Sequence, residues 1–312
     1  MAGRVVALCG GVGGAKLALG LSRVLPADDL TIVVNTGDDF VHLGLHVSPD
    51  VDTVLYTLSG LADPVQGWGR KGETWQFMAA LAALGGETWF RLGDADLALH
   101  VERTRRLAAG TALSAIVDDV RRRLGIGCHV VPMSDNPVRT HVETDEGWLE
   151  FQHYFVKRRC EPRVSGLRYD GALDAHVAPA ALAALADPGV DAIVLCPSNP
   201  MLSIEPMLAV PGLRAAVDAS AATVVAVSPI IGGRAVKGPT AKMMRELGVE
   251  ASASAVAERY VGLVDAFVVD EADAEAALPS GMRRIVARTL MTSDEDKERV
   301  ARAVLSSIPS IS

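Results

Sequence analysis

Cysteine and aromatic residues are scarce in this sequence of 312 residues, and it carries no excess of positive charge. Its four cysteines lie far apart without a C-x-x-C pair, which argues against a disulfide framework and favours a reducing compartment. No signal peptide is recognisable, and no apolar run approaches the roughly 18 residues that a membrane helix needs. A formal charge of -8 argues against nucleic-acid binding. These absences predict a cytoplasmic protein that binds neither membrane nor nucleic acid.

What the sequence does contain is an alternation of short apolar runs and helical patterns. The strand-like runs are residues 5–9, 30–34, 192–196, 223–227 and 267–269. Helical spacing follows most of them, as in residues 15–25, 240–247, 253–261 and 294–306. This alternation predicts an α/β fold with a Rossmann-like, mostly parallel sheet and helices on both faces. We expect one domain over residues 1–312, with its core in residues 1–40 and 180–312.

Two segments are expected to form smaller lobes over the strand ends. The first covers residues 41–130 and is mostly helical, with helices expected at 73–84, 94–109 and 111–124. The second covers residues 133–178 and contains a predicted hairpin, with strands 138–144 and 148–156 around a turn. Residues 36–49 are expected to be a loop, and Asp50 is expected to cap a helix that reaches Leu58.

A glycine-rich loop separates the first strand from the first helix; its residues are Gly10, Gly11, Gly13, Gly14 and Lys16. Glycines allow a ligand to approach the backbone, and a helix N-terminus favours an anion. The loop is not a Walker A motif, since Lys16 lacks the following Ser or Thr. It is not the dinucleotide fingerprint either, because Lys16 stands where the third glycine belongs. The loop predicts phosphate or nucleotide contact, and a tight strand–helix turn is the alternative.

Four carboxylates follow the second strand within fifteen residues, namely Asp38, Asp39, Asp50 and Asp52. In open α/β sheets, ligands bind at the carboxyl ends of the strands. Carboxylates that converge there suit Mg²⁺, which proteins hold with one or two carboxylates plus substrate phosphate. The alternative is structural, with Asp50 capping its helix and Asp38 in a turn.

Three more loops carry polar or aromatic residues that suit a binding pocket. Trp68 and Lys71 lie in a glycine-rich segment that suits a planar anionic ligand, although an ordinary surface loop is equally consistent. The other two loops follow successive strands and predict a nucleotide cleft; their candidate residues are Ser198, Asn199, Ser228 and Gly232. A zinc site at His42 and His46 is not expected, and no G-x-S-x-G elbow indicates a serine hydrolase.

Taken in order, these motifs resemble one known family. They are residues 10–16, 35–39, 47–53, 132–135, 197–200 and 228–232. Together they resemble the 2-phospho-L-lactate transferase family (CofD in archaea, FbiA in actinobacteria) of coenzyme F-420 biosynthesis, from about residue 4 to Thr292. The resemblance implies transfer of a phosphorylated three-carbon acid from a guanosine diphosphate-linked donor to the ribityl 5′-hydroxyl of Fo, a deazaflavin, with release of GMP. The alanine- and arginine-rich composition suggests the actinobacterial, enolpyruvyl donor.

The resemblance also implies roles for individual residues. Asp50, with Asp39 and Asp52, would hold Mg²⁺ against the donor diphosphate, or one of these carboxylates would accept the proton of the Fo hydroxyl. The glycine loop, with the four residues of the two strand-end loops, would hold guanosine and phosphates. The residues expected on the deazaflavin side are Trp68, Lys71, Ser134 and Asp135. We expect small-molecule substrates and leave a homodimer open.

A non-catalytic reading competes with the transferase. Relatives of the YvcK type resemble nucleotide-sugar sensors and share the glycine loop and the Asp-Asp pair, but their following segment is rich in glycine and serine. Here Phe40 follows Asp39, and residues 48–52 match the transferase pattern. The missing third glycine argues against a nicotinamide-dependent dehydrogenase. The sequence therefore favours the transferase.

Overall fold

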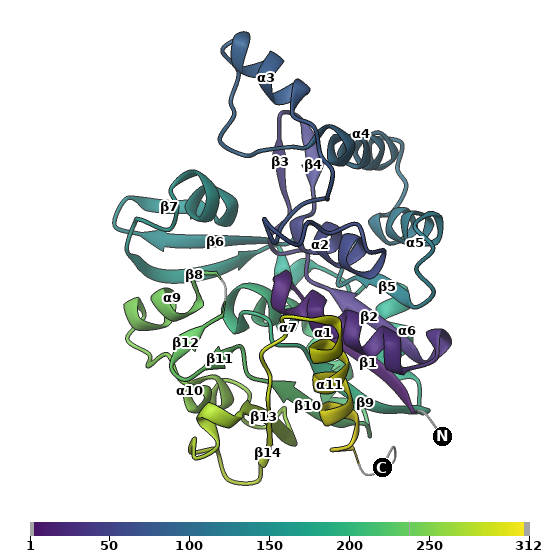
Figure 1. The fold of residues 1–312 in the computed structure, drawn as a ribbon, viewed down its shortest axis with the longest axis vertical. Helices are drawn as coiled ribbons and strands as arrows, with labels where there is room; N and C mark the ends of the chain where they lie inside the picture. The colour runs from purple at the N-terminus through teal and green to yellow at the C-terminus, as the bar shows by residue number, and fades with distance from the viewer. Residues whose placement is uncertain (1–2, 237, 309–312) are drawn as a thin grey trace.

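A seven-stranded parallel sheet forms the centre of the protein, as the computed structural model of residues 3–236 and 238–308 shows (Figure 1). The strands run in the order β14-β13-β10-β9-β1-β2-β5. Their bounds are β1 Arg4–Cys9, β2 Leu30–Val34, β5 His129–Pro132, β9 Val190–Leu195, β10 Thr223–Val227, β13 Ala266–Asp270 and β14 Arg283–Ala287. Every strand pair in this sheet is parallel. The predicted α/β fold is confirmed.

Helices cover both faces of the sheet, so its inner strands are buried on both sides. Alternate residues of β1 face opposite cores: Val6 and Leu8 join one cluster, and Val5, Ala7 and Cys9 join the other. The first cluster packs against α6 Pro179–Ala186, α8 Pro211–Ala219 and α10 Ala253–Glu258. The second packs against α1 Gly11–Val24, α2 Pro49–Leu58, α5 Leu113–Arg123 and α11 Asp294–Leu305.

The edge strand β14 was not predicted from the sequence. Its first two residues are the exposed Arg283 and Arg284, and it pairs only with β13. Edge strands often carry charged side chains, which removes the apolar run that identifies a buried strand. At the opposite edge, β5 pairs with β2 and belongs to the main sheet.

The segment between β2 and β5 forms the first lobe, and two predictions for it are wrong. The predicted loop of residues 36–49 contains a hairpin, β3 Phe40–His42 and β4 Leu45–Val47, closed by Leu43 and Gly44 with positive φ. Asp50 does not cap α2: Ser48 is the N-cap, and Asp50 lies in the first turn. The lobe continues through α3 Gln76–Ala83 and α4 Asp94–Ala108, with α3 farthest from the sheet (Figure 1).

The second lobe is a three-stranded antiparallel sheet of β6 Arg139–Thr144, β7 Gly147–Glu150 and β8 Val164–Asp170. The predicted strand 148–156 is wrong beyond Glu150, because the chain turns helical there and forms a π-helical turn, η2 His153–Lys157. Phe151 and Tyr154, three residues apart, are both buried, which is a helical rather than a strand repeat. The strand β8 was not predicted.

The short helix η1 Ala27–Asp29 connects α1 to β2. The remaining elements lie in the C-terminal half of the chain; they are η3 Ala172–Asp174, η4 Pro200–Ile204, α7 Glu205–Leu208, β11 Ile230–Ile231, β12 Arg234–Ala235, α9 Thr240–Glu246 and η5 Glu271–Asp273. Among the described residues, no helix combines the length and apolarity needed to cross a membrane. All four cysteines are free thiols, as their spacing predicts.

Candidate active site

A cavity of about 650 Å³ opens where the strand order reverses. The chain runs from β1 to β2 and β5 on one side, then returns to β9 on the other side of β1. In open α/β sheets, this switch point is where ligands bind, outside the carboxyl ends of the strands. Its walls come from the glycine loop, α2, the first lobe, η2 and the loops that follow β9, β10 and β14.

The glycine loop packs directly against the loop that follows β9. The Ser198 hydroxyl donates to the Gly10 carbonyl at 2.8 Å and accepts the Gly10 N–H at 3.1 Å. A Cβ on Gly13 would lie 2.4 Å from the Pro197 carbonyl oxygen, and one on Gly14 would lie 2.4 Å from the Ser198 hydroxyl. Packing therefore requires glycine at these two positions. Gly10, Gly11, Gly13 and Lys16 line the cavity, whereas Gly14 does not.

Asp50 and Asp38 are buried carboxylates in the cavity wall. Asp50 accepts the Gly11 N–H at 2.8 Å and an Asn35 amide N–H at 2.9 Å, which ties α2 to the ends of β1 and β2. Burial raises the pKa of Asp50 to about 6. Burial, followed by the charges of Asp50 and Asp39, raises the pKa of Asp38 well above its usual value. The Asp38 Oδ1 atom has no hydrogen-bond partner among the described residues.

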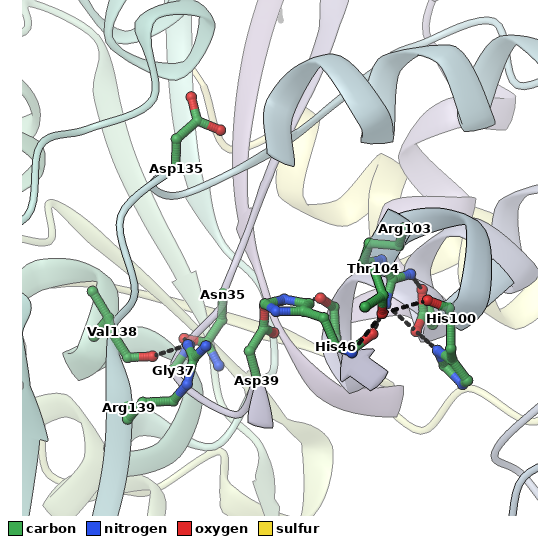
Figure 2. Close-up of polar contacts among 12 residues, drawn as sticks. Asn35, Gly37, Asp39, His46, His100, Arg103, Thr104, Asp135, Val138 and Arg139 are labelled. Atoms are coloured by element: carbon green, nitrogen blue, oxygen red, sulfur yellow. Dashed lines mark hydrogen bonds and ion pairs between the residues drawn. The ribbon is translucent and has the colours of Figure 1, made fainter. Parts of the chain in front are cut away.

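Asp39 faces away from this pair and toward the β3–β4 hairpin. Its Oδ2 accepts the Ser48 hydroxyl at 2.8 Å and contacts His46 Nε2 at 3.0 Å, and Figure 2 shows Asp39 and His46 side by side. The hairpin is held in turn by α4, because the His46 N–H donates to the Thr104 hydroxyl at 2.7 Å. Asp39 does not line the cavity, although sequence reasoning placed it with Asp50.

Asp52 takes part in a polar network between α2 and α4. Both its oxygens accept from the guanidinium of Arg103, which is only 1% exposed. His100 Nδ1 lies 3.7 Å from Asp52 Oδ2, and His100 Nε2 lies 3.2 Å from Asp96 Oδ2. The Tyr56 hydroxyl donates to Asp96 Oδ1 at 2.6 Å. All of these residues except Arg103 line the cavity.

The loops after β9 and β10 place further polar groups in the cavity wall. Asn199 Oδ1 accepts the N–H groups of Met201 and Leu202 and so caps η4, while its Nδ2 has no partner among the described residues. The Ser228 hydroxyl is engaged with Ile230 N–H and C=O in its own turn. Ser198, Asn199 and Ser228 all line the cavity, as the positions of the strand ends suggested.

Aromatic side chains line other parts of the wall. They are Trp68, Trp89 and Phe90 from the first lobe and Phe151 and Phe155 from the second. The rings of Phe151 and Phe155 are stacked, with centroids 5.3 Å apart. Arg91 also lines the cavity and lies over the Trp75 ring, 4.0 Å from its centroid. One cavity thus combines backbone N–H groups and carboxylates with apolar planar surfaces.

Four other predicted site residues do not line the cavity; they are Lys71, Ser134, Asp135 and Gly232. Ser134 donates to the His176 carbonyl at 2.6 Å, and Asp135 accepts from the Ser114 N–H and hydroxyl at the start of α5. Figure 2 shows Asp135 apart from the network around Asp39. The Gly232 N–H donates to Asp273 at 2.9 Å.

Sequence reasoning missed the α4 side of the site. Asp96 and His100 are four residues apart within a correctly predicted helix, as Asp52 and Tyr56 are on α2. Polar residues at this spacing share one face of a helix. The same spacing on both helices could have indicated a polar contact between them. Among the aromatic residues of the wall, Trp68 was predicted from its glycine-rich segment, whereas Trp89, Phe90, Phe151 and Phe155 were not.

The comparison with known families decides the assignment. The profile of "2-phospho-L-lactate transferase CofD" matches residues 5–307. The chain belongs to the CofD family. Its membership confirms the resemblance drawn from the motifs, and it supports a transferase activity for this chain.

Curated members of the CofD family align with nearly the whole chain. A phosphoenolpyruvate transferase from Streptomyces griseus is 43% identical over 97% of both chains, and one from Kitasatospora aureofaciens is 44% identical over 97% of both. A 2-phospho-L-lactate transferase from Methanopyrus kandleri is 43% identical over 97% of this chain and 96% of its own. A Bacillus halodurans crystal structure superposes with a TM-score of 0.64 at 18% identity, covering 98% of this chain and all of that one, which shows a shared fold.

Proposed function

We propose that this CofD-family protein transfers an enolpyruvyl-phosphate group from a guanosine diphosphate-linked donor to Fo. The ribityl 5′-hydroxyl oxygen of Fo attacks the phosphorus that carries the enolpyruvyl group. A new P–O bond forms, the bond from that phosphorus to the GMP oxygen breaks, and the hydroxyl loses its proton. The observation that carries the proposal is that surfaces suited to an anion, a cation and a planar apolar ring all line one cavity at the switch point.

The glycine-loop side of the cavity suits the guanosine diphosphate part of the donor. Helix α1, of 14 residues, begins at this loop, so its dipole and the N–H groups of its first turn favour phosphate, apart from the Gly11 N–H, which donates to Asp50. Lys16 contributes a positive charge to the same wall. The unpartnered Asn199 Nδ2 is a donor available to a ligand oxygen. Phosphoryl transfer depends mainly on such positioning and charge stabilisation.

Asp38 and Asp50 are the carboxylates that fit Mg²⁺ best. Both line the cavity, and the buried Asp38 Oδ1 lacks a partner among the described residues, which a hard cation would supply. Asp39 also has an unpartnered Oδ1, but it does not line the cavity, and His46 and Ser48 engage its Oδ2. Asp52 is less suited to Mg²⁺ because Arg103 donates to both of its oxygens. When bound, Mg²⁺ would neutralise charge on the diphosphate. Asp50 also holds the Gly11 backbone in place for that anion.

The aromatic part of the wall suits the deazaflavin ring of Fo. A tricyclic ring is planar and largely apolar, so it gains from contact with aromatic faces and edges. Trp68 is 44% exposed and lines the cavity, which leaves its ring available to a ligand. Arg91 in the same wall suits polar oxygens of the ring or ribityl chain.

The direct test is a reaction of the pure full-length protein with Fo and each donor, enolpyruvyl or lactyl, with and without Mg²⁺. We expect a Mg²⁺-dependent product with the mass of dehydro coenzyme F-420-0 from the enolpyruvyl donor. Product from the lactyl donor alone would revise the donor. Absence of product from both, with tight binding of a nucleotide sugar, would overturn the transferase in favour of a regulator.

The carboxylates are tested by Asp38→Asn and Asp50→Asn. Each should lower kcat by roughly 10²–10⁴, because the variant loses a carboxylate that would hold Mg²⁺ beside the reacting phosphate. Asp218→Asn is the matched control, since Asp218 pairs with Arg214 on α8 at the protein surface. If both cavity variants kept the turnover and Mg²⁺ dependence of the control, the assigned metal site would be wrong.

A further inference from the structure

The polar network between α2 and α4 forms a cluster of metal-ligand type in the cavity wall. Its candidate ligands are Asp52 on α2 and Asp96 and His100 on α4. One carboxylate oxygen from each aspartate and one ring nitrogen of His100 all lie within 4.8 Å of one another. Three atoms about 2.0–2.2 Å from one shared ion lie about 3.3–3.8 Å apart, so the ligand atoms would move closer together by up to about 1.5 Å when the ion binds.

Each carboxylate also accepts from a neighbouring donor. Arg103 donates to both oxygens of Asp52, from Nη2 to Oδ1 and from Nη1 to Oδ2 at 3.1 Å, and the Tyr56 hydroxyl donates to Asp96 Oδ1. The Oδ2 atoms of both aspartates face His100, and Asp52 Oδ2 would offer an ion its second lone pair. Burial raises the pKa of the Tyr56 phenol, so the hydroxyl remains protonated and donates. Outer donors that hold carboxylate ligands in this way are a regular feature of protein metal sites.

His100 supplies the second, independent observation. It is 1% exposed, and neither ring nitrogen makes an aligned hydrogen bond within the described residues, although both face carboxylates. Buried ring nitrogens that make no aligned hydrogen bond cost free energy, and a cation bound between the ring and the carboxylates would satisfy one of them. The side chains of Asp52, Asp96 and Arg103 together carry a formal charge of -1, which favours a cation.

We propose that Asp52, Asp96 and His100 bind a first-row transition-metal dication, such as Mn²⁺, Co²⁺ or Zn²⁺, at a site separate from the Mg²⁺ carboxylates. An imidazole with two carboxylates suits these ions, whereas Mg²⁺ prefers oxygen ligands alone. Three protein ligands leave coordination positions open, and all three residues line the cavity. Those positions would take water or an anionic oxygen of a bound ligand. The inference does not depend on the transferase reaction.

The test is a titration of chelator-treated full-length protein with Co²⁺ in an excess of Mg²⁺, followed by visible absorption and calorimetry. We expect one Co²⁺ per chain, with absorption bands of a nitrogen-containing site, and displacement by Zn²⁺. Binding that excess Mg²⁺ abolishes would overturn the proposal. So would nuclear magnetic resonance showing both His100 nitrogens protonated in saturating Zn²⁺, because the ring would then bridge the carboxylates as an imidazolium.

Variants assign the binding to these residues. His100→Gln should weaken Co²⁺ binding by at least about 100-fold, and Tyr56→Phe, which removes only an outer donor, by roughly 10–100-fold. His129→Gln is the matched control, because His129 lies exposed at the start of β5. Co²⁺ affinities equal to the control in Tyr56→Phe and His100→Gln would overturn the site. Tyr56→Phe alone decides the matter if His100→Gln fails to fold.

Discussion

Arg103 is the largest of the fully buried side chains that the structure describes. Its charge is matched by Asp52, which accepts from both terminal nitrogens, and its Nη1 also approaches the His46 carbonyl at 3.5 Å. Removal of one partner of a buried pair leaves the other charge uncompensated in a poorly solvated environment. At the residue scale, breaking this ion pair should therefore cost far more stability than breaking a surface pair.

The first prediction compares two arginines on α4. Arg103→Met should lower the free energy of unfolding by about 3–5 kcal/mol, because Asp52 stays buried without its partner. Arg105→Met removes an exposed pair with Glu102 on the same helix and should cost less than about 1 kcal/mol. Urea unfolding followed by circular dichroism measures both. If the two substitutions lowered the free energy of unfolding equally, the buried Arg103–Asp52 pair would matter no more to stability than the exposed pair.

At the scale of elements, helices α1 and α11 pack closely against each other. Gly20 on α1 permits it, since a Cβ there would lie 2.2 Å from the Lys297 carbonyl oxygen. The capping box of Ser293 and Asp296 begins α11 and holds that helix in register. Because α1 also carries the glycine loop at its start, this contact supports the wall of the cavity from behind.

The second prediction is that Gly20→Ala destabilises the protein by about 1–3 kcal/mol, through the steric clash of its Cβ with α11. Helix propensity alone predicts the opposite sign, a gain of about 1 kcal/mol. Ser22→Ala, two residues away, removes only a hydroxyl bonded to the Leu19 carbonyl and should change stability by less than about 0.5 kcal/mol. Thermal unfolding distinguishes the two signs. A more stable Gly20→Ala protein would contradict the close contact.

At the scale of the whole molecule, the cavity exists only because distant segments of the chain meet. The glycine loop, the first lobe, η2 and the loops after β9, β10 and β14 all contribute to one wall. The glycine loop, Ser198, Asn199 and Ser228 lie at the ends of the sheet strands, whereas the apolar rings come from the two lobes. This division predicts that the lobes determine binding of the acceptor Fo, and that the loops at the carboxyl ends of the strands determine binding of the donor.

The third prediction tests that division with two exposed tryptophans. Trp68→Ala should weaken Fo binding roughly tenfold, because stacking and apolar contact are lost, while nucleotide binding is retained. Trp148 on β7 is 41% exposed, similar to Trp68, but it does not line the cavity. Trp148→Ala should leave Fo binding unchanged. Equilibrium dialysis with Fo and with GMP measures both ligands, and an unaltered Fo affinity in Trp68→Ala would remove the stacking role.

Local sequence patterns predicted the regular strands and helices better than the irregular segments. The five inner strands are short apolar runs, and α4, α5 and α11 show helical spacing, so their identities followed from periodicity. The errors fall where tertiary contacts override local pattern. Residues 151–156 alternate like a strand but are helical, because Phe151 and Tyr154 both pack into the core. The strand β14 is polar because it lies at an edge of the sheet.

The sequence by itself determined the α/β class, the family and the loops at the sheet edge, because strand periodicity and short glycine and Asx motifs are local signals. Only the tertiary structure decided which carboxylates face the cavity. Asp38 and Asp39 are neighbours in the chain, yet the first lines the cavity and the second faces His46. The α2–α4 contact likewise brings Asp52 to Asp96 and His100 across more than forty residues. Side-chain direction and helix packing are set by long-range contacts, which no local pattern contains.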